Sequence, residues 1–164
     1  MFSRILVAVD GGDSGTVAVD FATSLAHDLG ARVRVVHVNE LIVGGRGVAY
    51  ESESEAMEIV DSAVAALRGR GIEADGVHYL ANCFTLPDRI VEAAHGWGAD
   101  VIVFGSRRRR RWLRLRGAAL RERVTAMSGL PVVTAPAPLK VGRRVGAGSL
   151  EQELAQLVVS STGG

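Results

Sequence analysis

The sequence has very little cysteine, few aromatic residues and no long hydrophobic run. Cys83 is the one cysteine among 164 residues, which excludes an intrachain disulfide and a zinc site made of several cysteines. The longest stretch without a charged residue is 16 residues, at 124–139, and three prolines interrupt it, which excludes a membrane span. The apolar run at 5–9 is too short for a signal-peptide core. We therefore expect a one-domain protein of the cytoplasm.

The composition is that of a globular protein with an aliphatic core and an uneven charge distribution. Only eight residues are aromatic, although 48% are hydrophobic and the net charge is +1, which excludes disorder over the whole chain. Residues 107–123 contain nine arginines and one acid, a net charge of +8, while the remaining ten basic and seventeen acidic residues give −7. The near-neutral total is therefore one basic segment on an acidic body.

Apolar runs typical of buried strands alternate along the chain with the apolar spacing of helices. The helical stripe of residues 17, 21, 25 and 29, which ends at Gly30, is one example. The strands are expected at residues 4–10, 32–38, 77–80, 100–105 and 130–134. This order predicts an α/β fold with a doubly wound five-stranded parallel sheet, helices on both faces and residues 77–80 as a weak edge strand. Ligands of such sheets bind beyond the carboxyl ends of the strands, here the turns after Asp10, Val38 and Gly105.

The end of the chain differs from the part before it. Residues 135–148 are rich in proline, glycine and basic residues and are typical of a linker. Leu150, Leu154, Leu157 and Val158 then form a short apolar helical stripe. We expect a domain at 1–138, followed at 139–164 by a linker and a short C-terminal amphipathic helix.

Four blocks in the chain have a familiar order and spacing. They read RILVAVDGG at 4–12, VRVVHV at 33–38, ADVIVFGSR at 99–107 and RERVTAMSGLPVVTAP at 121–136. Together they resemble the universal stress protein family. The resemblance implies a Rossmann-like domain of the adenine nucleotide alpha hydrolase type and a homodimer that pairs its last strands, here through Val132 and Val133.

The resemblance also implies a ligand for some members of the family, ATP or another adenine nucleotide. Those members use an aspartate that ends the first strand, backbone atoms that end the second, and a loop after the fourth. That loop reads Gly, two residues, Gly, nine residues, then Gly-Ser or Gly-Thr. Its glycines let backbone N–H groups approach phosphate closely.

Carried over to this chain, the nucleotide pattern is incomplete. Asp10 and Val38 match, and Gly105 matches the first glycine, with Ser106 after it. Arg108 stands at the second glycine, and the Gly-Ser pair falls on residues 118–119, which are both alanine. We therefore expect the usual ATP mode to be absent. The candidate nucleotide site is Asp10, Val38, Gly105, Ser106, Arg107 and Arg108.

The arginine-rich segment has three interpretations that the sequence leaves open. It is a solvated loop of like charges, or it binds an anion such as a nucleotide phosphate by bidentate hydrogen bonds, or it contacts a larger partner. The larger partner is nucleic acid, an acidic protein or anionic lipid, and nucleic acid is the less favoured because the rest of the body is acidic and repels it. The candidate anion- and partner-binding arm is Arg109, Arg110, Arg111, Arg114 and Arg116.

Other polar residues have plainer explanations. His37 lies inside an apolar strand and is expected to be a hydrogen-bonded core histidine. In the turn after the first strand, Asp13 or Ser14 is the expected helix N-cap, and Asp10 either binds a ribose hydroxyl or orients the N–H groups of the turn. The glutamates at 51, 53, 55 and 58 are typical of the acidic start of a helix.

No set of residues has the spacing of a metal site or of a catalytic acid/base pair, so we expect no catalytic residue and no enzyme activity. The leading hypothesis is a non-enzymatic regulatory or signalling dimer whose nucleotide site is degraded or reworked by arginines. The alternative is a nucleotide-binding stress sensor in which Asp10 and Val38 hold the nucleoside and the arginines at 107–111 hold phosphate.

Overall fold

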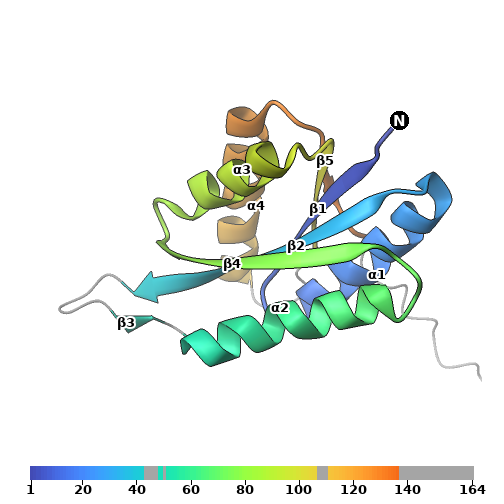
Figure 1. The fold of residues 1–164 in the computed structure, drawn as a ribbon. Coiled ribbons are helices and arrows are strands. Elements are labelled where there is room, and N and C mark those ends of the chain that lie inside the picture. Colours follow the sequence, from blue (N-terminus) through green and yellow to red (C-terminus); the bar gives the residue numbers. More distant parts are fainter. Residues whose placement is uncertain (43–47, 50, 107–110, 137–164) are drawn as a thin grey trace, which may run out of the picture.

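The structure, a computed structural model, describes residues 1–42, 48–49, 51–106 and 111–136. Helices and strands alternate as the hydrophobic pattern predicts (Figure 1). The elements are β1 (Arg4–Val9), α1 (Asp13–Leu29), β2 (Arg32–Ile42), β3 (Val48–Ala49), α2 (Glu53–Arg68), β4 (Ala74–Asn82), α3 (Leu86–Trp97), β5 (Val101–Phe104), α4 (Arg111–Ser128) and β6 (Val132–Thr134). Among the described residues, no helix combines the length and apolar character needed to span a membrane.

The sheet contains five parallel strands in the order β4-β2-β1-β5-β6, which confirms the predicted doubly wound architecture. The short strand β3 adds an antiparallel pair at the end of β2. Helices α1 and α2 cover one face and α3 and α4 the other (Figure 1). β1 alternates between the two cores: Ile5 and Val7 face α1 and α2, and Leu6 faces α3 and α4.

The order of the strands indicates where along the sheet a ligand is expected to bind. From β1 the chain moves outward through β2 to β4, and then returns to the other side of β1 with β5 and β6. The direction therefore reverses between β1 and β5, and ligands of such folds bind beyond the carboxyl ends of the strands at this point. Asp10 follows β1 and Gly105 follows β5, so both lie at this reversal.

Three strand details differ from the sequence expectations. β4 covers nine residues rather than residues 77–80, although it lies at the sheet edge as expected. Gly76 within β4 lets α2 pack closely, because a Cβ there would collide with Val60. β2 continues to Ile42, so Val38 lies inside the strand and does not end it. β3 was not predicted, since two residues leave no readable pattern.

The helix boundaries confirm two predictions and contradict one. α1 stops at Gly30 in the left-handed conformation, and α3 has Pro87 in its first turn, as predicted. The N-cap of α1 is Gly12, with no side-chain cap, so the expected cap by Asp13 or Ser14 is wrong.

Candidate functional site

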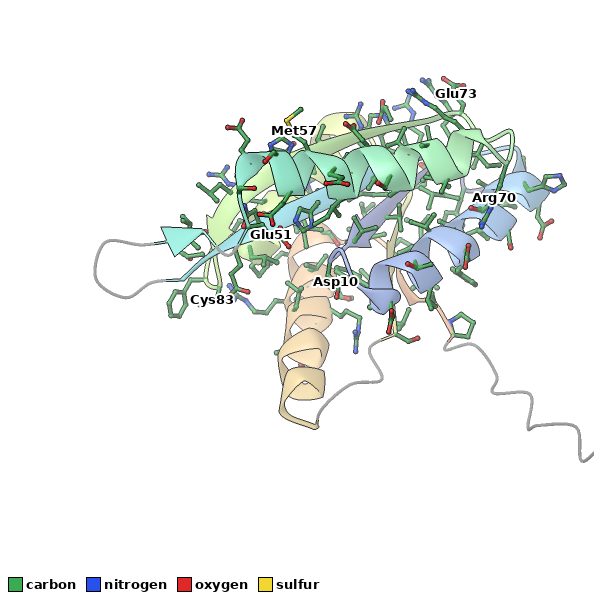
Figure 2. The ribbon with its side chains drawn as sticks, turned by 90° about the horizontal axis from the view of Figure 1, so that it is seen from below. Asp10, Glu51, Met57, Arg70, Glu73 and Cys83 are labelled. Carbon is green, nitrogen blue, oxygen red and sulfur yellow. The ribbon has the colours of Figure 1, made fainter. Side chains whose placement is uncertain are left out.

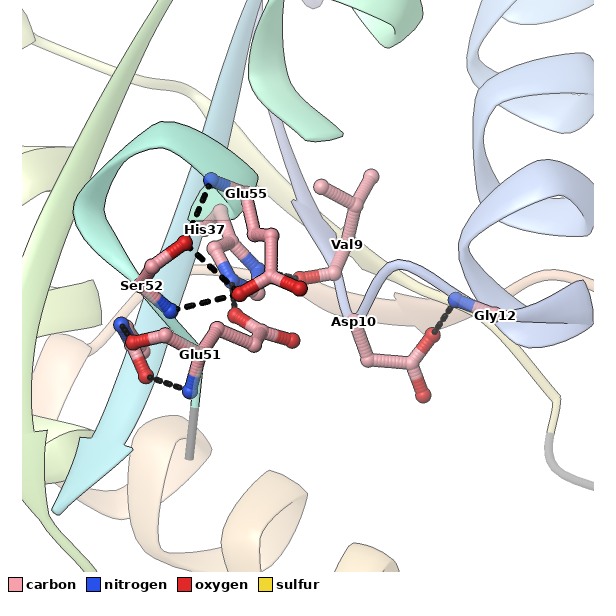
Figure 3. A network of polar contacts seen from close by, with 8 residues as sticks. Val9, Asp10, Gly12, His37, Glu51, Ser52 and Glu55 are labelled. Atoms are coloured by element: carbon pink, nitrogen blue, oxygen red, sulfur yellow. Dashed lines mark hydrogen bonds and ion pairs between the residues drawn. The ribbon is translucent and has the colours of Figure 1, made fainter. Parts of the chain in front are cut away.

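Asp10, the first residue after β1, stabilises the turn that leads into α1. Its Oδ1 accepts a hydrogen bond from the backbone N–H of Gly12 at 3.2 Å (Figure 3). It also accepts one from the backbone N–H of Gly15 at 3.1 Å. The Gly15 N–H also donates to the Gly12 carbonyl oxygen at 2.9 Å, so the Asp10 carboxylate is a second acceptor there and joins the end of β1 to the start of α1. The expected role of Asp10 in orienting the turn is confirmed, and contact with a ribose hydroxyl stays a prediction.

The backbone of β2 beyond His37 has no β1 strand beside it. β1 ends at Val9, which pairs with His37, whereas β2 continues alongside β4 as far as Leu41. Arg32 donates its backbone N–H to Ser3 of the β1 side, and in a parallel pair the same direction recurs every second residue. The backbone groups of Val38 and Glu40 therefore face the side of β2 on which β1 has ended. β3 pairs with Leu41 and Ile42 from this same side, because β4 occupies the other side of Leu41. The part of β2 between these two pairings is Val38 to Glu40.

Gly105, at the end of β5, is required for packing. A Cβ on this residue would collide with the backbone carbonyl oxygen of Ser14, and would lie 2.5 Å from the Ser14 carbonyl carbon and Oγ. Only glycine lets β5 and the first turn of α1 approach this closely. Its presence therefore needs no phosphate ligand to explain it. The next residue, Ser106, has a buried Oγ with no hydrogen-bond partner among the described residues.

The arginine-rich segment is helical where the structure describes it. α4 begins at Arg111, so Arg111, Arg114 and Arg116 lie on a helix, and of the three interpretations the solvated loop does not hold for these three residues. Residues 118–119, at the place of the Gly-Ser pair, are seven or more positions inside this helix. Interior helical N–H groups donate to carbonyl groups four residues earlier, which removes them from ligand binding. Arg107, Arg108, Arg109 and Arg110 lie outside the described residues.

A polar network that the sequence did not predict as a unit joins β1, β2 and the start of α2. The ring of His37 is 3% exposed, with Nδ1 2.9 Å from the Val9 carbonyl oxygen and Nε2 2.6 Å from Glu51 Oε2. The Asn39 side chain donates to the Glu51 carbonyl at 2.7 Å and accepts from its N–H at 3.2 Å. The expectation of a hydrogen-bonded core histidine is confirmed.

Glu51 lies close to Asp10. A Cβ on Gly11, the residue after Asp10, would be 3.9 Å from Glu51 Oε1. Figure 2 shows the two acidic side chains near each other, with Glu73 at the far end of β4. Glu51 precedes α2 rather than beginning it, because Ser52 caps the helix and forms a capping box with Glu55. The alternation of His37 and Asn39 at the end of an apolar strand is the sequence signal that could have indicated this network.

A cavity of about 310 Å³ lies at the opposite end of β2 and β4, and the charged residues that line it are Arg32, Arg68, Glu73 and Asp75. Arg32 contacts Glu73 at 2.6 Å, and Arg34, stacked 5.0 Å from the centre of the Trp97 ring, forms two hydrogen bonds to Asp75. The hydrogen bonds from Arg34 hold the pKa of Asp75 below its ordinary value. This cluster stabilises the sheet edge and is separate from the site at Asp10.

The remaining candidates from the sequence are the last strand, the cysteine, any metal site and the C-terminal segment. β6 lies at the edge of the sheet next to β5, with Val132 and Val133 half-buried, so an edge is present for the expected dimer contact. Cys83 is exposed. Within the described part of the chain, no three His, Cys, Asp or Glu side chains are grouped to hold a metal ion. The linker and C-terminal helix expected at 139–164 lie outside the described residues.

Comparison with known proteins matches the fold and the part of the chain that contains the four sequence blocks. A model of the family described as "Universal stress protein family" matches residues 1–136. The chain is 30% identical over 122 residues to universal stress protein YxiE of Bacillus subtilis, covering 65% of this chain and 80% of that protein.

Solved structures agree with this match. One is a universal stress protein family member from Burkholderia pseudomallei, with 26% identity and a TM-score of 0.64 over 83% of this chain and 97% of that one. Another is the universal stress protein of Archaeoglobus fulgidus in complex with dAMP, with 29% identity and a TM-score of 0.61 over 82% of this chain and 98% of that one.

Proposed function

This chain belongs to the universal stress protein family, and we propose that it acts there as a non-enzymatic regulatory or signalling protein that has lost the family's mode of ATP binding. The helical state of residues 118–119 carries the proposal. The resemblance places loop N–H groups on triphosphate at these positions, but an interior helical N–H is already bonded to a carbonyl group of its own helix.

The experiment is a thermal unfolding scan of the full chain with millimolar ATP and magnesium. A ligand that binds only the folded state raises the melting temperature by mass action. We expect no shift. A saturable stabilisation of several degrees that disappears in Asp10→Asn, which keeps the acceptor for the turn, would contradict the proposal and show that the ordinary nucleotide mode survives.

A second candidate, binding of an adenine mononucleotide, is favoured by the backbone at the end of β2. Val38 and Glu40 face the side of Asp10, beyond the end of β1, and a relative 29% identical was solved with dAMP. A nucleoside held there would need neither the second glycine nor the Gly-Ser pair. The arginines at 107–111 would then meet the single phosphate by charge-assisted hydrogen bonds.

Titration with dAMP tests this candidate apart from the first. We expect saturable binding of dAMP and no comparable binding of ATP. Because guanidinium–phosphate attraction is screened by salt, the affinity is expected to fall between low and high ionic strength. Absence of dAMP binding at low salt would remove the mononucleotide site. An affinity that does not change with salt concentration would show that the arginines do not contact the phosphate.

The rest of the proposal concerns the partners of the protein and its location in the cell. Homodimerisation through Val132 and Val133 is supported by the edge position of β6. The expected partner of the basic segment is a small anionic ligand or an acidic protein. Nucleic acid is less favoured, because the body outside residues 107–123 has a net charge of −7 and repels a long polyanion. The cytoplasmic location expected from the sequence stays a prediction.

A further inference from the structure

The outer edge of β4 is long, regular and uncharged over most of its length. Among the described strands β4 pairs with β2 alone, and Figure 1 shows it at the front of the sheet with α2 on one side and α3 on the other. Its nine residues pair in register from Ala74 to Asn82 without a bulge. From Gly76 to Asn82 there is no acid, lysine, arginine or proline. Edge strands avoid pairing with other chains by charge, proline, bulges or short length, and this stretch has none of these features.

Every second residue of β4 turns its backbone groups outward, away from β2. The Val33 N–H of β2 donates at 2.9 Å to the carbonyl oxygen of Glu73, the residue before β4. In a parallel pair this direction alternates along the strand, so the odd-numbered residues from 75 to 81 bond to β2. The even-numbered residues from 74 to 82 therefore present their N–H and C=O groups to the outside of the sheet.

Both ends of this outward row already have a donor. The Nε of Arg68 donates to the Ala74 carbonyl oxygen at 2.8 Å. In the turn that follows β4, the Thr85 N–H donates to the Asn82 carbonyl oxygen at 3.1 Å. A strand added from outside therefore finds unoccupied carbonyl groups only between these two residues.

The part in between, residues 76–80, is the open window of β4. The outward N–H and C=O groups of Gly76, His78 and Leu80 have no hydrogen-bond partner among the described residues. Apolar surface is exposed on the α2 side as well, because Leu80 is 53% exposed and Met57 of α2 is 47% exposed. A row of unpaired backbone groups beside apolar side chains is the surface to which a further strand is added.

The open window is complementary to itself when two copies run antiparallel about a two-fold axis at His78. In this register His78 faces His78 of the second copy, and Gly76 faces Leu80. Each of these pairs exchanges both of its N–H···O bonds, so that every outward group of the window is satisfied. The next pair would be Ala74 with Asn82, the two residues whose carbonyl groups are already occupied. The ladder therefore begins and ends where the free groups do.

The side chains fit the same register, because directly opposite residues lie on the same face of a sheet. On the α2 side, Leu80 lies opposite Gly76 of the second copy. Since Gly76 has no side chain, nothing on that residue separates Leu80 from Val60, which packs directly on the glycine. On the α3 side, the half-buried Val77 lies opposite Tyr79. Pairs of an aromatic with a β-branched side chain stabilise antiparallel strands.

We propose that the open window of β4 is an interface for a second copy of this chain, which adds its own β4 antiparallel about a two-fold axis at His78. The contact joins two sheets into one and makes no use of the nucleotide site. It lies at the opposite edge of the sheet from β6. Where the expected contact through Val132 and Val133 forms as well, two different two-fold contacts alternate, and assembly extends beyond the dimer.

Disulfide formation between introduced cysteines tests the register. Both variants carry Cys83→Ser, because Cys83 is exposed and is the one cysteine of the sequence. In His78→Cys two thiols face each other in a pair whose Cα atoms are about 5.5 Å apart, within the range of a disulfide. Leu80→Cys is the matched control on the same edge and face, because its two copies lie about 14 Å apart along the strands.

Covalent dimer is measured on non-reducing gels after addition of oxidised glutathione. At about 100 µM chain, we expect His78→Cys to form it about tenfold faster than Leu80→Cys, because pairing raises the local concentration of the facing thiol to the millimolar range. Equal rates, or a faster reaction of Leu80→Cys, overturn the proposed pairing. Equal melting temperatures of the reduced variants show that both keep the fold.

Sedimentation of the full chain tests the interface without cysteines. His78→Glu places two carboxylates directly opposite each other, which destabilises the pair, whereas His78→Gln has the same shape without the charge. With rising concentration, we expect the weight-average mass of the natural sequence and of His78→Gln to reach about twice that of His78→Glu, whether or not β6 also pairs. Equal masses of the two variants would show that no second copy binds at β4.

Discussion

Gly105→Ala tests whether the glycine after β5 serves packing rather than phosphate. The added methyl group would overlap the Ser14 carbonyl oxygen and lie 2.5 Å from its carbon and from the Ser14 hydroxyl. Two of these three atoms belong to the backbone, so no rotation of a side chain relieves the overlap. The first turn of α1 must therefore move away from β5, or β5 must shift in the sheet.

The expected loss of stability follows from this rigidity. Forcing extra atoms into a packed interior costs about 1–3 kcal/mol, and overlap with backbone places this substitution at about 3 kcal/mol. For a chain of this length, such a loss lowers the melting temperature by about 6–12 °C. Gly96→Ala is the matched control, because Gly96 lies in α3 with nothing within 4 Å of the added Cβ. There alanine should stabilise the helix by up to about 1 kcal/mol.

Urea unfolding followed by circular dichroism measures both variants without any ligand. The two substitutions add the same methyl group, so a difference in sign between them isolates the collision with α1 from the general effect of glycine. A Gly105→Ala protein as stable as the natural sequence would refute the packing argument. Gly105 would then have to be explained by a ligand.

Three further outcomes are expected. Restoring the family's pair by Ala118→Gly with Ala119→Ser should not produce an ATP-dependent thermal shift, because both positions lie inside α4; a shift would show that these N–H groups are available. Hydrogen bonds from Arg34 lower the pKa of Asp75, so their stabilisation is present above the ordinary carboxyl range and is lost as the pH falls through the lowered value. The unfolding free energy of Asp75→Asn should therefore decline less steeply than that of the natural sequence between about pH 5 and pH 2, and parallel declines would contradict this. Sedimentation at micromolar concentration should show a dimer, and a monomer would exclude pairing of β6 edges.

Much of the fold could be predicted because burial imposes a period on the sequence. The run at 5–9 lacks alternation, which is what a strand buried on both faces requires, and β1 confirms it. Gly30 and Pro87 marked helix boundaries correctly, because their backbone preferences hold in any context. The early start of α4 was missed because the arginines were weighed as repelling charges, although arginine is a good helix former.

The site was less predictable because its contacts join distant residues. His37 and Glu51 are 14 positions apart, and nothing in local periodicity indicates that the two side chains meet. Asp10 was placed correctly at the end of β1, but its bond to Gly15 depends on how the turn folds back. Residues whose role is set by their own backbone were therefore predicted, and those whose role is set by a partner were found only in the structure.

Asp10 and Gly105 match the family's nucleotide pattern, yet each has structural work in this chain that accounts for its presence without a ligand. Loss of binding in Asp10→Ala is consequently ambiguous, since the variant also removes the acceptor for two N–H groups of the turn. Asp10→Asn separates the two roles, because its amide oxygen still accepts from Gly12 and Gly15 while the charge is gone. If dAMP affinity falls in Asp10→Asn and the melting temperature does not, the carboxylate contacts the ligand. If both stay unchanged, Asp10 serves the turn alone, and any nucleotide here is held by the backbone of β2 and not by the aspartate.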